Sequence, residues 1–196
     1  MTQKQWELTI EPNGHAGLAY EAGQFSWLNV GHSPFSMKEN PFSICSAPAI
    51  GPEVSFMIKE PGDFTRTISQ IELGSVAYLD GHFGSLTVEG RNELGVAFIA
   101  GGVGIAPLLG SIRQMRQTGD PRKVKLICGN RVAEHIAYRS ELDAEDVTYV
   151  LSEPTEAWQG ETGFIELSAL GSHFLTTGNQ RMAFCDVRTR DNDGYS

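Results

Sequence analysis

The sequence is poor in cysteine, in long apolar runs and in positive charge. Three cysteines are scattered at positions 45, 128 and 185 of 196 residues. This odd number supports neither a disulfide framework nor the four thiolates of an iron–sulfur cluster. No apolar run approaches the roughly 20 residues of a membrane-spanning helix, and residues 1–5 do not begin a signal peptide. We therefore expect a cytoplasmic protein with no transmembrane segment in this chain.

The charge balance excludes further classes of partner. Lys and Arg number 15 against 24 Asp and Glu, which gives a formal net charge of −9. This sign argues against nucleic acid and against anionic membrane surfaces. The histidines lie in turns or on polar faces without metal-ligand spacing, so no metal site is predicted. An apolar fraction of 40% over this length is enough to bury a core in one large domain or two small ones.

The pattern of predicted secondary structure changes near residue 92. The first part reads as short strands separated by turn residues, which is typical of a small antiparallel barrel or sandwich. The strands are expected at 6–10, 24–30, 42–46, 54–59, 76–79 and 86–88. After that, strands alternate with helices, which is typical of a parallel sheet; strands are expected at 96–100, 123–128 and 148–152, and helices at 107–117 and 134–142. We predict a β-barrel domain over 1–92 and a parallel-sheet α/β domain over 93–196.

A glycine-rich turn, GGVGIAP, follows the apolar strand 96–100. Pro107 is well tolerated in a first helical turn, and apolar residues then recur at helical spacing at Leu108, Leu109, Ile112 and Met115. Strand, turn and helix aim unpaired backbone N–H groups at one point, where a phosphate can bind closely because glycine has no side chain. We interpret the turn as the pyrophosphate site of a nicotinamide nucleotide. The alternative is an ordinary tight connection between a strand and a helix.

Four segments in one order resemble a known family. The segments are Asn40–Ser46 (NPFSICS), Gly62–Thr65 (GDFT), Gly81–Gly84 (GHFG) and the GGVGIAP turn. Together they resemble the ferredoxin–NADP reductase superfamily, and segments such as 151–163 resemble its bacterial ferric-reductase and NADPH-oxidase-like branch. The resemblance runs from about residue 6 to residue 183. It implies a flavin-binding antiparallel β-barrel followed by a parallel-sheet nucleotide-binding domain, with FAD and NADP or NAD as cofactors.

The resemblance assigns roles to particular residues. Ser43 would be the catalytic residue, as the hydrogen-bond partner of flavin N5, the atom that accepts hydride, and Phe42 would offer an apolar wall. The amides of the 62–65 turn would hold the flavin diphosphate. Arg131, together with Arg139, would read the 2′-phosphate that marks NADPH, which favours NADPH slightly; the alternative is that both are surface arginines. The residues assigned to the cofactors are Asn40, Pro41, Phe42, Ser43, Ser46, Ile58, Lys59, Gly62, Asp63, Phe64, Thr65, Gly101, Gly102, Gly104, Pro107, Asn130 and Arg131.

The sequence also departs from the family pattern. Asn40 stands where the family has arginine or histidine, so one cationic contact is lost, and His82 replaces an expected proline. The family closes with a strand, a Cys-Gly-Pro turn, a helix and a last strand. Here the strand begins at 181–185 and the polar tail from Asp186 does not continue it. A shifted reading frame after Cys185 can encode Met-Cys-Gly-Pro, so our hypothesis is that a frameshift truncated an ordinary reductase.

The function implied by the resemblance is a flavin-dependent oxidoreductase. It would pass hydride from NAD(P)H to FAD, and electrons on to a one-electron acceptor such as ferric iron, a haem or a partner protein. Two alternatives stay open: a truncated, catalytically impaired remnant that binds flavin weakly or not at all, and an electron-transfer subunit of a larger complex.

Overall fold

The computed structural model describes residues 5–31, 40–59, 65–90, 94–165 and 182–187, with only the backbone for 65–67 and 182–187. The chain divides into two compact units. The first comprises Met1–Gly90 and Ala106–Asp120, and the second comprises Arg91–Ile105 and Pro121–Ser196. The helix after the glycine turn therefore belongs with the first unit, although it follows a strand of the second.

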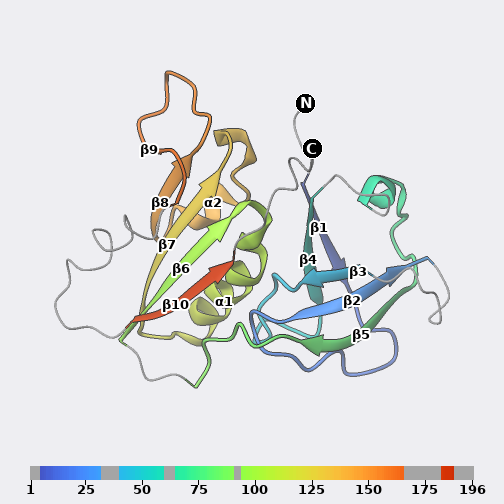
Figure 1. The fold of residues 1–196 in the computed structure, drawn as a ribbon. Coiled ribbons are helices and arrows are strands. Elements are labelled where there is room, and N and C mark those ends of the chain that lie inside the picture. The colour runs from blue at the N-terminus through green and yellow to red at the C-terminus, as the bar shows by residue number, and fades with distance from the viewer. Residues whose placement is uncertain (1–4, 32–39, 60–64, 91–93, 166–181, 188–196) are drawn as a thin grey trace. The chain divides into compact units, whose positions relative to one another are not determined.

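The first unit contains the antiparallel sheets of a β-barrel (Figure 1). Strand β1 (Gln5–Ile10) pairs with β4 (Val54–Lys59). Strand β2 (Phe25–Val30) lies between β3 (Asn40–Ser43) and β5 (Ala77–Phe83). An isolated bridge from Ile44 to Phe56 connects the end of β3 to β4. The predicted barrel architecture is confirmed.

The core of this unit is built by the alternate residues of these strands. Strand residues that point to one face of a pleated sheet are spaced by two, and here they gather into one cluster. Its buried members are Leu28, Val30, Ile44, Val54, Phe56, Ile58 and Ile68. Trp6, Leu8, Ile10 and Phe42 are among the half-buried residues that pack against it.

The strand predicted at 86–88 is wrong, and the strand predicted at 76–79 is instead β5, which runs further. Strand β5 continues to Phe83, and the chain from Gly84 to Val88 is irregular. Gly81 has a φ of +63°, and the register between β2 and β5 shifts between Phe25 and Trp27. A glycine and a bulge let a strand absorb residues that otherwise make a turn. Val88 is nonetheless buried, which explains the apolar pattern.

The second unit contains a parallel sheet in the order β10-β6-β7-β8-β9 over the described residues. The strands are β6 (Gly95–Gly101), β7 (Lys123–Asn130), β8 (Asp146–Leu151), β9 (Glu161–Thr162) and β10 (Met182–Val187). Residues 95–100 of β6 are buried on both faces, as central parallel strands require. Ala97, Ile99, Ile127 and Val150 form a core cluster with Ile165 packed against it.

The helices differ in their bounds from the prediction. Helix α1 runs from Ile105 to Thr118, so it begins before Pro107. A single helix over 134–142 is wrong: a 3-10 turn, η3 (Ala133–His135), is separated from a short α2 (Arg139–Leu142). Tyr138 has a φ of +53°, in the left-handed region. A continuous helix cannot pass through such a residue.

The strand predicted to end at Cys185 continues to Val187. Asp186 pairs with Ile99 and Val187 pairs with Ala100 of β6, in parallel register. The polar sequence was therefore a poor guide to the end of this strand, because backbone pairing to β6 does not depend on side-chain polarity. The rest of the tail, 188–196, lies outside the described residues.

Candidate functional site

Strand β3 carries the first predicted motif and presents its two faces differently. Ser43 lies opposite Phe25 and Pro41 lies opposite Trp27 on β2, so these four residues share one face. Phe42 lies opposite buried Ser26 and packs against the core cluster. The structure thus separates Phe42 and Ser43 onto opposite faces of the strand.

The aromatic residues on the face of Ser43 were missed by the sequence analysis. Trp27 is 36% exposed and Phe83 is 41% exposed, and the ring centroid of Phe83 lies 5.7 Å from that of Phe25. The period of two in β2, once its register with β3 is known, places Phe25 and Trp27 beside Ser43. That register comes from the tertiary structure and cannot be read from either strand alone.

The hydroxyl of Ser43 fits a site for a polar ligand atom. Ser43 is half-buried, and its hydroxyl makes no hydrogen bond with any described residue. A half-buried hydroxyl beside aromatic rings can donate to, or accept from, an atom of a planar ligand without breaking a hydrogen bond to a described residue. The predicted role of Ser43 is compatible with this placement.

Ser46 has a structural role within the protein. Its Oγ accepts a hydrogen bond of 2.9 Å from the backbone N–H of Ser55 and lies 2.8 Å from the hydroxyl oxygen of Tyr20. Burial raises the pKa of Tyr20, and the hydrogen bond with Ser46 partly offsets this effect. Ser46 therefore fixes the segment after β3 to β4 and to the loop that carries Tyr20.

The other flavin-side residues are placed only in part. Ile58 is 1% exposed and belongs to the core cluster, whereas Lys59 is half-buried at the end of β4. Gly62, Asp63 and Phe64 lie outside the described residues, and Thr65 begins the 3-10 helix η1 (Thr65–Gln70) by its backbone alone. In the sequence, the predicted diphosphate turn lies between Lys59 and η1.

Helix α1 is fixed to the segment that follows Ser43. Arg113 Nη1 donates to the carbonyl oxygen of Cys45 at 3.0 Å and pairs with Glu7 Oε1 at 3.1 Å. The next residue of the helix also contributes, because Gln114 Oε1 accepts from the N–H of Ala49 at 3.0 Å. A Cβ on Gly110 would lie 2.9 Å from the carbonyl oxygen of Ile44. The helix that leaves the glycine turn is thus locked onto residues 44–49.

The predicted succession of strand, glycine turn and helix is present in the structure. Gly101 ends β6, Gly102–Gly104 make the 3-10 turn η2, and the N–H of Ile105 bonds to the carbonyls of Gly102 and Val103. Gly102 has a φ of +53°, which favours glycine whatever the ligand. Pro107 is buried in the first turn of α1.

Gly101 tests whether these residues fit a nucleotide. Its φ of −116° is ordinary extended backbone, and a Cβ added there would meet nothing within 4 Å. Neither strain nor crowding inside the protein therefore requires glycine at this position. Close approach of a ligand phosphate to the backbone is a reason that remains, so the turn fits the pyrophosphate of a dinucleotide.

The ends of β7 and β8 carry the second nucleotide motif. Asn130 Nδ2 donates to Cys128 Sγ at 3.4 Å, and Arg131 Nε pairs with Glu153 Oε2 at 2.8 Å. Burial raises the pKa of the Cys128 thiol to about 11, against a smaller lowering by Asn130. Sequence reasoning identified Arg131 but did not identify its acidic partner.

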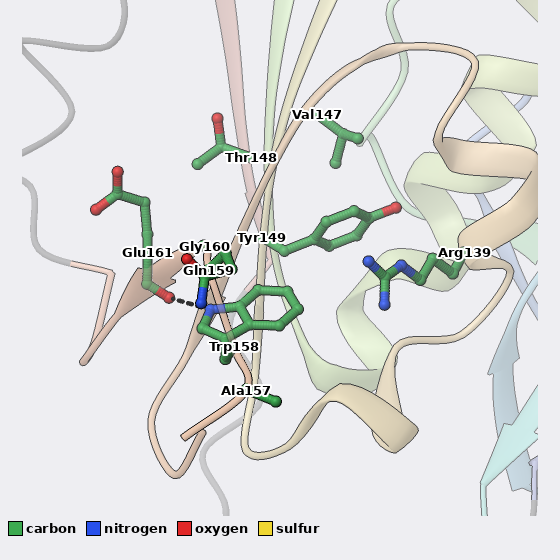
Figure 2. A pocket seen from close by; sticks show the side chains of 9 residues that line it. All are labelled: Arg139, Val147, Thr148, Tyr149, Ala157, Trp158, Gln159, Gly160 and Glu161. Atoms are coloured by element: carbon green, nitrogen blue, oxygen red, sulfur yellow. Dashed lines mark hydrogen bonds between the residues drawn. The ribbon is translucent and has the colours of Figure 1, made fainter. Parts of the chain in front are cut away.

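A pocket of about 610 Å³ lies beside β8 (Figure 2). The guanidinium carbon of Arg139 lies 5.4 Å from the ring centroid of Tyr149 and 5.7 Å from that of Trp158. The Tyr149 hydroxyl donates to Asp143 Oδ1 at 2.8 Å, and the pKa of Tyr149 is raised mainly by burial. Trp158 Nε1 donates to the carbonyl oxygen of Glu161. This bond anchors the Trp158 side chain within its own loop.

The part of the chain that the structure describes shows neither a metal-binding cluster nor a membrane-spanning helix. These residues contain no group of three or more His, Cys, Asp and Glu side chains arranged to hold a metal ion. None of the helices in the described ranges has the length and apolar character to cross a membrane.

Comparison with known proteins identifies the family. A family model described as an FAD-binding domain matches residues 7–124, and one described as an oxidoreductase NAD-binding domain matches residues 98–186. The chain belongs to this family of FAD- and NAD-binding oxidoreductases. The two matches overlap over the glycine turn and α1, and they confirm the superfamily indicated by the sequence motifs. FAD and a nicotinamide nucleotide are the cofactors to which these two domains correspond.

The chain spans only part of the length of the relatives that it matches. The reductase component of propane 2-monooxygenase from Rhodococcus jostii is 32% identical over 145 residues, which are 72% of this chain and 38% of that protein. Ferredoxin–NADP reductase B from Sorangium cellulosum is 28% identical over 170 residues, which are 82% of this chain and 69% of that protein. The CS-b5R domains of human Ncb5or, solved in the NAD⁺ form, match with a TM-score of 0.72 and 25% identity over 94% of this chain and 58% of theirs.

Proposed function

We propose that this chain passes hydride from NAD(P)H to FAD and electrons on to a one-electron acceptor. The observation that carries the proposal is the open space over Gly101 in a glycine turn that lies in both matched domains. The flavin-side motif on β3 supports it. Bound FAD would supply the conversion of one hydride, which carries two electrons, into two single-electron transfers.

The residues of the chain would bind and orient the two cofactors. The backbone amides of the glycine turn would bind the pyrophosphate of the nucleotide, because Gly101, Gly102 and Gly104 have no side chains to keep a phosphate away. The Ser43 hydroxyl would bind the reacting edge of the flavin. Arg113 would keep α1 fixed on the carbonyl of Cys45, two residues after Ser43.

Two lines of evidence point to different classes of electron acceptor. The ferric-reductase-like segments favour ferric iron or a haem, whereas one relative is named as a reductase component of a monooxygenase. An electron-transfer subunit that works with a partner is therefore the second candidate. We expect the reaction in the cytoplasm, because Cys45 and Cys128 are not disulfide-bonded and thiols persist in a reducing compartment.

A visible spectrum of the purified protein with FAD, taken under argon before and after NADH or NADPH, tests the proposal. We expect flavin bands that bleach with a nucleotide. Bands that do not bleach would indicate a flavin-binding chain with a non-functional hydride-donor site, and the absence of bound flavin would indicate a remnant. Activity that needs an added partner would favour the subunit.

Gly101→Ala supplies a matched variant for the nucleotide site. The added methyl meets no protein atom, so the thermal stability of the protein should stay within about 0.5 kcal/mol of wild type. It would stand where the pyrophosphate approaches, so the KM for nucleotide should rise about tenfold or more. An unchanged KM would contradict the assignment of this turn.

A further inference from the structure

Arg131 and Glu153 form an ion pair across the carboxyl ends of two neighbouring strands. The ladder between β7 and β8 continues past both strands: Ser152 N–H bonds to Asn130 O at 3.0 Å, and Glu153 N–H bonds to Arg131 O at 2.8 Å. Their side chains, 63% and 57% exposed, meet at 2.8 Å from Nε to Oε2. The backbone thus holds the acidic residue directly beside the arginine.

This pair lies at the edge of the sheet where a nucleotide would bind. Gly101 of the glycine turn pairs with Gly129 of β7, and Asn130 pairs with Leu151 of β8. Ligands of parallel sheets bind beyond the carboxyl ends of the strands. Arg131 therefore stands one strand away from the turn that would hold the pyrophosphate, at the position to which the family resemblance assigned the 2′-phosphate of the adenosine.

The charge of the pair decides which nucleotide it can accept. A phosphomonoester carries a charge of about −1.5 to −2 at neutral pH, and arginine binds it best with two parallel N–H donors. Here the Nε of Arg131 is already paired with the Glu153 carboxylate. A phosphate bound to Arg131 would therefore lie beside that negative charge and be repelled by it. A ribose that carries a free 2′-hydroxyl can instead donate a hydrogen bond to the carboxylate.

The second arginine considered for the 2′-phosphate is engaged elsewhere. Arg139 stacks over Tyr149 and Trp158 and lies 3.9 Å from Asp143 Oδ2 through its Nε. Figure 2 shows its guanidinium beside the Tyr149 ring within the pocket. Moving Arg139 to a phosphate would break the contacts with both rings and with the carboxylate. Neither arginine is therefore in place for a 2′-phosphate.

We propose that Glu153 makes this site select NADH over NADPH, by neutralising Arg131 and by accepting the 2′-hydroxyl of the adenosine ribose. This inference rests on the proposed function and names its hydride donor. It reverses the slight preference for NADPH drawn from the arginines in the sequence. The acidic partner of Arg131 becomes visible only when β7 and β8 are paired.

Glu153→Gln tests the proposal because it removes the charge and keeps the shape. In wild type, we expect kcat/KM to be about tenfold or more higher for NADH than for NADPH. The Glu153 carboxylate would repel the 2′-phosphate of NADPH, and a modest repulsion at an exposed site is enough for a tenfold effect. In the variant this ratio should fall about tenfold, mostly through a lower KM for NADPH. Preference for NADPH in wild type would overturn the proposal.

Asp146→Asn is the matched control. Asp146 pairs with Lys125 at 3.7 Å across the same two strands, but at their amino ends, and the substitution removes the same charge. The ratio of NADH to NADPH should not change. An equal shift in both variants would mean that net charge alone sets the preference, and Glu153 would not be the residue that determines it.

Binding of nucleotide fragments separates this inference from the proposed function. Calorimetry of the FAD-loaded protein would compare 5′-AMP with adenosine 2′,5′-bisphosphate, which differ in the 2′-phosphate and need no hydride transfer. Wild type should bind 5′-AMP at least as tightly, and Glu153→Gln should bind the bisphosphate about tenfold tighter than wild type does. This pattern would support the inference even if neither nucleotide reduced the flavin. Binding of neither fragment, or a variant that binds as wild type does, would overturn it.

Discussion

Gly110 in the middle of α1 is the position at which two physical effects give opposite predictions for one substitution. A Cβ there would lie 2.9 Å from the carbonyl oxygen of Ile44 and 3.1 Å from that of Ser46. Both oxygens belong to backbone that follows β3, so they cannot rotate away as a side chain could. Gly110→Ala must therefore displace either the helix or residues 44–46 by about half an ångström to reach an ordinary contact.

The size of each effect decides the expected sign. Alanine is favoured over glycine in a helix interior by about 1 kcal/mol. Overpacking costs about 1–3 kcal/mol, and two rigid backbone contacts place Gly110→Ala at the upper end of that range. We expect a net loss of about 2 kcal/mol in the free energy of unfolding, which corresponds to a melting temperature lower by about 4–8 °C for a chain of this size.

Urea and thermal unfolding of the full chain measure this loss. Gln117 is an exposed residue of the same helix, so the difference between Gln117→Ala and Gln117→Gly gives the propensity effect without the contact. FAD affinity should also fall in Gly110→Ala if residues 43–46 bind flavin. A Gly110→Ala protein as stable as wild type, or more stable, would refute the argument, because propensity would then outweigh the contact with the β3 segment.

Three further outcomes are expected from the contacts of the first unit. Ser46→Ala should lower the free energy of unfolding by about 1–3 kcal/mol, because it leaves the Tyr20 hydroxyl and a backbone amide of β4 without their bonds; urea denaturation measures this, and an unchanged midpoint would contradict it. Arg113→Met should lower the free energy of unfolding by about 2 kcal/mol through the lost bond to the Cys45 carbonyl. The exposed residue Gln117 lies on the same helix, and Gln117→Met should change stability by no more than about 0.5 kcal/mol; equal effects would mean that the bond contributes nothing. Burial raises the pKa of Tyr20 above its ordinary value of 10.0. The neutral Tyr20 side chain therefore contributes fully to stability below pH 10, and this contribution is lost as the pH rises through the folded-state pKa. Urea denaturation between about pH 8 and pH 11 should show this decline in wild type and a smaller decline in Tyr20→Phe.

The sequence alone determined the architecture and the position of the phosphate turn. Short segments bounded by turn residues predicted β1 and β4 at 6–10 and 54–59, because turn residues mark where strands end. The GGVGIAP turn predicted the junction of β6 and α1, since glycine conformation and helical spacing are local properties. The order of the motifs predicted the superfamily, which the family models confirm.

Tertiary structure decided the features that depend on partners distant in sequence. Strand β5 extends beyond the predicted 76–79 because a glycine and a bulge fit it to β2. The helix predicted over 134–142 is interrupted where Tyr138 takes a left-handed conformation. Pairing of β7 with β8 placed Glu153 beside Arg131, 22 residues later in the chain. Local patterns set the conformation of a segment, whereas the charge and shape of a site depend on which segments the fold brings together.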